Sequence, residues 1–362
     1  MNQIKRFREE PGQTTINWFH TFRRKPSFMG FSLFLVAIIL NTIVRGPGEF
    51  FNVNTMNTLF VTQMPFLLLV LAQGVLLISG TLDVSIGIQI GLVNVVTIMT
   101  IQEWGVPFIV GAIFGILIAM VASIVCWLLV SVWRLPTLLA SFALISVILG
   151  VNVLIMDVPQ GRLPMEIFHM YNNVHFGWLP AASFAIVLVM VIWLFIKRTP
   201  FGTNIYAVGA NPQNAYAAGI SPVKVQFQAF MFKGFITGVA GICLTMNALS
   251  GNPLQGEALG LRSLAACIVG GLTFGGWGTM SSALFGGSFM ILIQSMMHPL
   301  FSRLMEMFPG LTLGTYWHNM VSDTIIFLGL LLSIVTIKGQ REALRISIRD
   351  KYSSRRREEH AK

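Results

Sequence analysis

The sequence contains very little charge. Asp, Glu, Lys and Arg make up 10% of its 362 residues, whereas apolar residues make up 54%. A water-soluble domain carries roughly 25% charged residues, so this composition excludes an ordinary soluble protein. The few charges are also unevenly placed. Four long stretches have none at all, namely residues 50–82, 105–133, 135–156 and 263–302.

Sequence signatures of catalysis and metal binding are missing as well. The chain has no GxxxxGK[ST] phosphate-binding loop, no HExxH motif and no cysteine pair with metal-site spacing. We therefore expect no catalytic residue, no metal and no cofactor bound by this chain. Cys126, Cys243 and Cys267 lie in or at the end of apolar stretches, which favours buried thiols. An intramembrane protease using Ser288 and His298 is an alternative, but the small residues there are better explained by helix packing.

Long apolar stretches recur along the whole chain. A helix needs about 20 residues to cross a hydrocarbon core of roughly 30 Å, and the alternating segments of a membrane barrel are absent. The sequence therefore predicts an all-α, polytopic membrane helix bundle of about ten spans. A break at residues 80–83 could join the second and third spans, and the Gly-rich eighth and ninth could include a re-entrant segment. The expected spans are residues 27–44, 58–79, 84–101, 107–131, 135–156, 178–196, 225–249, 263–280, 281–298 and 316–337.

Lys and Arg residues concentrate at both ends of the chain. Residues 1–25 carry six of them and residues 338–362 carry nine. Because basic segments stay in the cytoplasm, we expect both termini there, which requires an even number of spans. The chain then divides into a basic amino-terminal segment (1–26), a transmembrane domain (27–337) and a basic carboxyl-terminal tail (338–362). The tail is better matched to anionic membrane lipid than to nucleic acid, so no nucleic-acid partner is expected.

The longest polar connection between spans is residues 197–224, which the same topology places in the cytoplasm. Asn211 is a suitable N-cap, and Pro212 suits the first turn of a helix. Residues 213–218 are good helix formers, and Gly219 would end the helix. This capped helix predicts a docking site for a partner. A surface turn without a partner is an equal alternative.

Asp83 and Ser85 lie in the sequence GTLDVSIG (residues 80–87), at a break between two apolar spans. An ionisable residue within the membrane is costly, which favours a functional role. The expected topology places Asp83 near the inner interface, where it could simply cap the following helix. We favour capping over contact with a solute.

A second unusual stretch is GGLTFGGWG at residues 270–278. Glycine at this density does not suit an ordinary helix, since each glycine costs about 1 kcal/mol relative to alanine. Non-helical backbone inside a membrane must be covered by protein or line a water-filled cavity, so the stretch predicts a gate or path lining. The candidate path or gate residues from both stretches are Asp83, Ser85, Gly270, Gly271, Thr273, Gly275 and Gly276.

Three stretches together resemble the permeases of bacterial ABC sugar importers, the group that takes up ribose, xylose, arabinose and galactosides. They are GTLDVSIG at residues 80–87, RTPFGTNIYAVGANPQNAYAAGI at 198–220 and LAACIVGGLTFGGWG at 264–278. The resemblance extends from about residue 58 to 337. Thr81 and Ala218 depart from the usual Gly and Ser, which makes transfer of a substrate from any one member unsafe.

The resemblance implies a role for the loop helix and a set of partners. The helix would be the coupling helix that enters a cleft of a separate ATPase subunit, and that subunit would use the ATP. A second permease copy or close paralogue would complete the path, and a periplasmic or lipid-anchored binding protein would deliver the solute. The protein would be a multi-pass protein of the bacterial inner membrane. The implied coupling residues are Gly209, Asn211, Ala215, Gly219 and Ile220.

Two other functions remain open from the sequence. A stand-alone secondary transporter or channel would need an ion relay, and Asp83 and Asp323 are the few acids at hand. An ABC permease for nucleosides or branched-chain amino acids would share the general plan. Asp323 shares a helix face with Asn319, and we favour a polar patch at a helix end over contact with the path or a partner.

Overall fold

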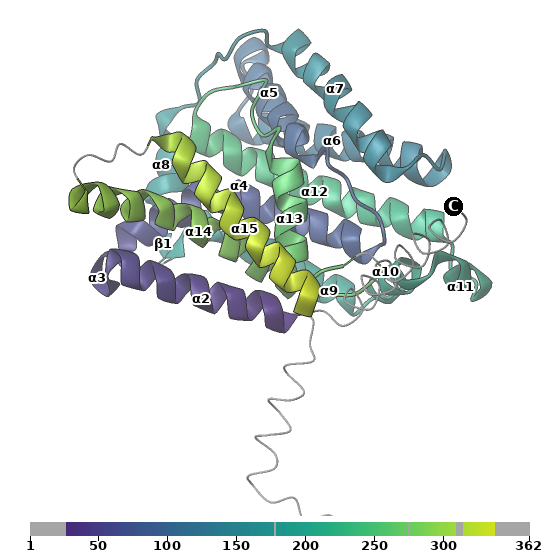
Figure 1. Ribbon diagram of the computed structural model, residues 1–362. Coiled ribbons are helices and arrows are strands. Elements are labelled where there is room, and N and C mark those ends of the chain that lie inside the picture. Colours follow the sequence, from purple (N-terminus) through teal and green to yellow (C-terminus); the bar gives the residue numbers. More distant parts are fainter. Residues whose placement is uncertain (1–26, 177–178, 274, 309–313, 337–362) are drawn as a thin grey trace, which may run out of the picture.

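The computed structural model describes residues 27–176, 179–273, 275–308 and 314–336. These residues form a bundle of α-helices with one short pair of strands (Figure 1). The predicted all-α, polytopic bundle is therefore confirmed. The predicted basic segments at residues 1–26 and 338–362 lie outside the described residues.

The elements follow one another with short connections. In chain order they are α2 (Ser27–Arg45), α3 (Pro47–Phe50), α4 (Val53–Ile78), α5 (Ile86–Trp104), α6 (Phe108–Trp127), the π-helix η1 (Leu128–Val132), α7 (Thr137–Ile155), α8 (Met165–Asn173), β1 (His175–Phe176), β2 (Leu179–Pro180), α9 (Ser183–Lys197), α10 (Pro200–Ala210), α11 (Pro212–Ala217), α12 (Pro222–Ala248), α13 (Leu259–Val269), α14 (Met280–Met307) and α15 (Thr315–Thr336).

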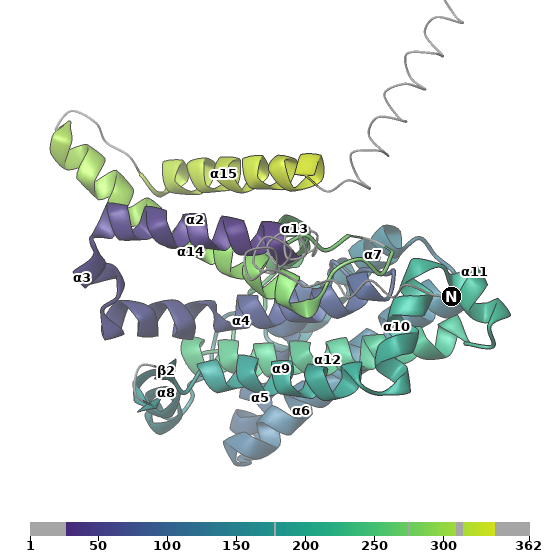
Figure 2. The same ribbon diagram turned by 90° about the horizontal axis from the view of Figure 1, so that it is seen from below.

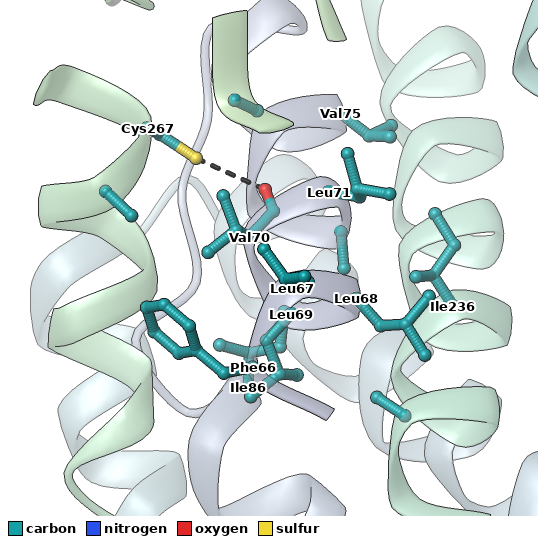
Figure 3. Packing of buried hydrophobic residues seen from close by; sticks show 14 of the residues in the cluster. Phe66, Leu67, Leu68, Leu69, Val70, Leu71, Val75, Ile86, Ile236 and Cys267 are labelled. Atoms are coloured by element: carbon teal, nitrogen blue, oxygen red, sulfur yellow. Dashed lines mark hydrogen bonds between the residues drawn. The ribbon is translucent and has the colours of Figure 1, made fainter. Parts of the chain in front are cut away.

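Helix α4 lies at the centre of the bundle. In its most apolar stretch 89% of the residues are buried, against 22% for α2 and 28% for α7. Helices α12, α14 and α13 pack around it. Figure 3 shows side chains of α4 between two neighbours, with the Cys267 thiol of α13 donating to the Val70 carbonyl at 3.2 Å. All three cysteines are free and buried, as predicted.

The outer helices expose apolar side chains instead. In the part of the chain that the structure describes, seven helices are long and apolar enough to cross a membrane, and the bent pair α9–α10 raises the number to eight. The seven are α2, α4, α5, α6 with η1, α7, α12 and α14. Exposed apolar surface on so many long helices is typical of a protein solvated by lipid. Reaching about ten spans requires crossings that are shorter or broken.

The predicted eighth span, residues 263–280, is wrong as a continuous helix. Helix α13 has only 11 residues, and a glycine-rich turn follows it. The chain before α13 runs alongside α5 toward its first residue. Asn94 Oδ1 accepts the backbone N–H of Asn252 at 2.8 Å, and Gly260 lies directly against the Val84 carbonyl. The chain therefore crosses this depth as a broken element, an irregular approach followed by a short helix.

Two different structures occupy the two ends of the bundle. Figures 1 and 2 place α10 and α11 at one end, and α3, α8 and the strand pair at the other. Helix α9 meets α10 at a bend of 84°. Pro200 stands at the first position of α10, where its missing N–H costs nothing, and Thr199 before it is extended. The sharp bend thus turns the chain out of the bundle.

Candidate functional site

The loop helix α11 has the capped form that the sequence predicts. The Asn211 side chain accepts the backbone N–H groups two and three residues further on, at 2.9 and 3.0 Å. Gly219 ends the helix with φ of +84°, and the Ile220 N–H donates to the Ala215 carbonyl at 3.0 Å. Ala215 is buried, whereas Tyr216 is 72% exposed. Tyr216 therefore lies on the exposed face of α11, and Ala215 lies on the face that packs against the rest of the protein.

Helix α10, which the sequence analysis did not anticipate, joins α11 to the membrane domain. Its end carries Gly209, which lies directly against the carbonyl of Ile78, the last residue of α4. A Cβ on Gly209 would also stand 3.2 Å from the Cα of Gly276. A Cβ on Gly80 would in turn stand 3.3 Å from the Cα of Gly209. Three glycines, at 80, 209 and 276, thus form one backbone-to-backbone contact.

This three-glycine junction brings together the three stretches that carry the family resemblance. They are far apart in sequence, since Gly80 precedes Gly209 by 129 residues and Gly209 precedes Gly276 by 67, yet each stretch contributes one glycine. Side chains are excluded at such short distances, and backbone contact is stiff because it has no rotamers to adjust. A displacement of α10 must therefore also displace the segment after α4 and the turn after α13.

Asp83, just beyond this junction, takes part in a buried ion pair. Its Oδ2 lies 2.7 Å from the Nζ of Lys233 on α12, and both side chains are 0% exposed. Asp83 Oδ1 accepts the N–H of Ser85 at 2.8 Å and the Ser85 hydroxyl at 2.6 Å. Lys233 also donates to Gln89 Oε1 at 2.6 Å and to Ser123 Oγ at 3.1 Å. The pair is hydrogen-bonded on all sides and joins α5, α6 and α12.

Asp83 is fully buried inside the bundle, although it stands only three residues after Gly80 of the three-glycine junction. Lys233 stands 11 residues into α12, which corresponds to about 16 Å along the helix axis. Residues 79–85 are not helical and lead the chain back among the helices after α4. Capping is only part of the role of Asp83, because it accepts the Ser85 N–H at the start of α5 while Lys233 neutralises its charge.

Lys233 is the functional candidate that the sequence analysis missed. It is a lone charge in the interior of the predicted span 225–249. A buried ammonium is strongly unfavourable without an acidic partner. Because Lys233 needs an acidic partner and the spans contain few acids, the sequence alone could have suggested its pairing with Asp83.

The glycine stretch after α13 has two parts. Gly270 lies where α2, α13 and α14 cross, because a Cβ on Gly30 would stand 2.6 Å from its carbonyl and a Cβ on Gly286 2.7 Å from its Cα. It therefore packs helices closely. Gly271 has φ of +95°, a conformation that favours glycine, and it begins a turn.

The rest of that stretch forms the turn itself. The Thr273 N–H donates to the Trp277 carbonyl at 3.1 Å. Gly275 and Gly276 have φ of +99° and +74°. The structure thus places Gly276 against α10 and Gly270 among the membrane helices. It brings Asp83 and Ser85 together in the ion-pair network, separate from this turn.

The protease alternative is not supported by the geometry. Ser288 and His298 both lie on α14, ten residues apart along one continuous helix, which separates them by about 15 Å. A nucleophile and its base must come within hydrogen-bond reach. Among the residues that the structure describes, no group of three His, Cys, Asp or Glu side chains could hold a metal ion.

A helix bundle whose outer helices expose apolar side chains, with a capped helix turned out at one end, is the architecture of a polytopic membrane protein. Comparison with known proteins identifies the class. Residues 55–332 match the family described as the branched-chain amino acid transport system permease component, and the chain belongs to that family. It is therefore a multi-pass membrane permease, and the predicted resemblance to ABC importer permeases is confirmed.

Curated relatives cover most of the chain. The autoinducer 2 import system permease protein LsrC of Photorhabdus luminescens is 26% identical over 250 residues, which is 68% of this chain and 75% of the relative. The protein of the same name from Yersinia enterocolitica is 25% identical over 288 residues, covering 78% of this chain and 76% of the relative. No solved structure matches the chain.

Proposed function

We propose that this chain is the permease subunit of an ATP-binding-cassette importer in the bacterial cytoplasmic membrane. The observation that carries the proposal is the contact of α10 and α11 with the membrane helices through the three-glycine junction. A separate ATPase subunit would bind α11 and hydrolyse the ATP. This chain would bind no cofactor. Closure of the ATPase would push α10 against the segments at 80 and 276. Stiff contacts of this kind suit gating by rigid-body motion.

We also propose a topology of ten crossings with both termini in the cytoplasm. The three crossings beyond the seven of ordinary length are α9, the broken element ending in α13, and α15, whose 22 residues extend for about 33 Å. An even number returns the chain to its starting side. The distribution of charge supports the orientation. Lys197 and Arg198 lie beside α10 at one end, whereas Glu49 of α3 and Glu166 of α8 lie at the other.

The solute we propose is a sugar or a similar small polar molecule. The related permeases from Photorhabdus and Yersinia are named for import of autoinducer 2, and the family description names branched-chain amino acids. Both are small polar solutes. The family is described as a component of a transport system, which disfavours a stand-alone secondary transporter or channel. A second permease copy or paralogue and a solute-binding protein outside the membrane would complete the importer.

The proposal is tested by purifying the tagged permease from native membranes and identifying ATPase subunits that carry a GxxxxGK[ST] loop. We expect Tyr216→Asp, on the exposed face of α11, to lose the ATPase while the permease keeps its yield and elution volume. Tyr316→Asp is the matched control, because Tyr316 is a similarly exposed tyrosine on α15. Equal recovery with both variants would mean that the ATPase docks elsewhere. Absence of any ATPase from the wild-type preparation would refute the importer.

A further inference from the structure

A second ion pair lies within the membrane part of the chain. Arg262 Nη2 of α13 stands 3.3 Å from Asp323 Oδ1 of α15. Gln294 of α14 completes the cluster, since its amide oxygen, turned toward Arg262, accepts from both guanidinium Nη atoms at 3.1 Å. Three helices thus contribute one polar side chain each to a single cluster.

The cluster lies well away from the ends of α14 and the start of α15. Gln294 is 14 residues from the start of α14, about 21 Å along the axis and near the middle of this 28-residue helix. Asp323 is eight residues from the start of α15, about 12 Å. Both helices are long enough to cross a hydrocarbon core, so the cluster lies well inside it.

The exposure of this pair sets it apart from the buried pair. The side chains of Asp83 and Lys233 are completely buried (0% exposed), whereas those of Arg262 and Asp323 are 35% and 59% exposed. Placing an open charge pair against hydrocarbon at this depth is expensive, because charged side chains within a membrane normally face protein or a water-filled cavity. The outward side of Asp323 must therefore meet water or protein.

The surface around Asp323 is hollowed and mixed in character. A concavity of about 510 Å³ is lined by Tyr316, Met320, Asp323, Thr324 and Phe327 of α15. It offers a carboxylate, a hydroxyl and two aromatic rings on one helix face. Such a combination suits a ligand that has many hydroxyl groups and an apolar ring face.

The neighbouring element has an irregular approach that packs against α5. Helix α13 begins only at Leu259, after an irregular approach from residue 250 alongside α5. Irregular backbone at membrane depth persists only under protein cover or beside a water-filled cavity. Arg262 stands in the first turn of α13, about 200° around the helix from Gly260, which packs against Val84 before α5; the ion pair therefore lies on the side of α13 that faces α15.

We propose that this face, with the Arg262–Asp323 pair at its centre, lines the aqueous translocation path and contacts a polyhydroxylated solute. The inference rests on the proposed importer function and adds the residues that meet the solute. Asp323 would accept hydrogen bonds from solute hydroxyls, and Arg262 would donate to solute oxygens. The Tyr316 and Phe327 rings would cover the apolar face of a sugar ring. The pair keeps both charges satisfied when no solute is present.

The experiment measures water access with MTSET, a charged thiol reagent, on the purified permease–ATPase complex in nanodiscs. The three native cysteines are buried, which keeps the background low. Asp323→Cys is compared with Leu188→Cys on α9, a position of similar exposure (50%). We expect labelling of Cys at 323 to be at least about tenfold faster, since a charged reagent is excluded from hydrocarbon by more than 1.4 kcal/mol. A mixture of pentoses and hexoses should slow this labelling, and leucine should not.

Each outcome decides between supporting and rejecting the inference. Equal rates at 323 and 188, or disulfide formation between two copies of Asp323→Cys without MTSET labelling, would overturn the aqueous path. Protection by leucine instead of sugars would overturn the polyhydroxylated solute. Recovery of the ATPase with Asp323→Cys shows that the importer assembles, so a failure at position 323 is separate from a failure of the importer itself.

Discussion

Breaking the buried ion pair from one side should destabilise the protein more than removing both charges. Lys233→Met removes the Nζ that lies 2.7 Å from Asp83 Oδ2, and leaves a carboxylate with 0% exposure. Asp83 would keep its bonds from Ser85 and Gln89, but nothing would neutralise its charge. Asp83→Asn leaves the reverse situation, an ammonium held only by neutral oxygens of Gln89 and Ser123.

The expected magnitudes follow from the cost of an uncompensated buried charge. Each single variant should lose about 3–5 kcal/mol of folding stability. The double variant Asp83→Asn/Lys233→Met contains no buried charge and should lose less than either single variant. The coupling free energy between the two positions should therefore exceed about 3 kcal/mol, at the upper end of the range for residues in contact.

Thermal unfolding in detergent, followed with a thiol-reactive fluorogenic dye, measures this directly because all three cysteines are buried until the protein opens. We expect each single variant to lower the Tm by at least about 4 °C and the double variant to recover part of that loss. Ser141→Ala is the control, since the buried Ser141 hydroxyl bonds only to carbonyls of its own helix. If the double variant loses the sum of the two single losses, the pair is not coupled and the reasoning is refuted.

Two further predictions concern the link between α11 and the membrane helices. Gly209→Ala should lower the Tm and abolish recovery of the ATPase, because its Cβ would overlap the Ile78 carbonyl. Gly150→Ala is the control, since the space around Gly150 is open. Equal Tm values for the two variants would contradict the close contact at Gly209. Asn211→Ala should loosen α11 by about 1 kcal/mol, measured as faster hydrogen exchange of the α11 amides, whereas Asn211→Ser should retain most of the protection. Unchanged exchange in Asn211→Ala would show that the cap is not needed.

The helices of ordinary length and the loop helix could be predicted from the sequence for clear physical reasons. Backbone groups inside a membrane must be satisfied within the segment, so a long apolar run has few structures available. Helix α11 could be predicted because Asn211 is a favourable N-cap and Pro212 is a favourable residue for the first turn. Both signals are local and depend on few neighbours.

The parts that escaped prediction depend on contacts distant in sequence. Glycines at 80 and 270–278 predicted breaks, but not the direction in which the chain continues after each break. The eighth span was wrong for this reason, because the chain crosses before residue 270 and turns after it. The pairing of Asp83 with Lys233 also escaped prediction, because it becomes visible only once α5, α6 and α12 are placed together.

The buried ion pair also constrains how the protein is made. Asp83 and Lys233 are 150 residues apart in the chain. At a synthesis rate of about 5–20 residues per second, Asp83 leaves the ribosome roughly 7–30 s before its partner. During that interval the Asp83 carboxyl group lacks Lys233 and must stay hydrated or take up a proton, because an unpaired carboxylate is costly inside lipid. The charged pair therefore forms only after α12 has been made, so the packing of α5, α6 and α12 around it is a late step of assembly.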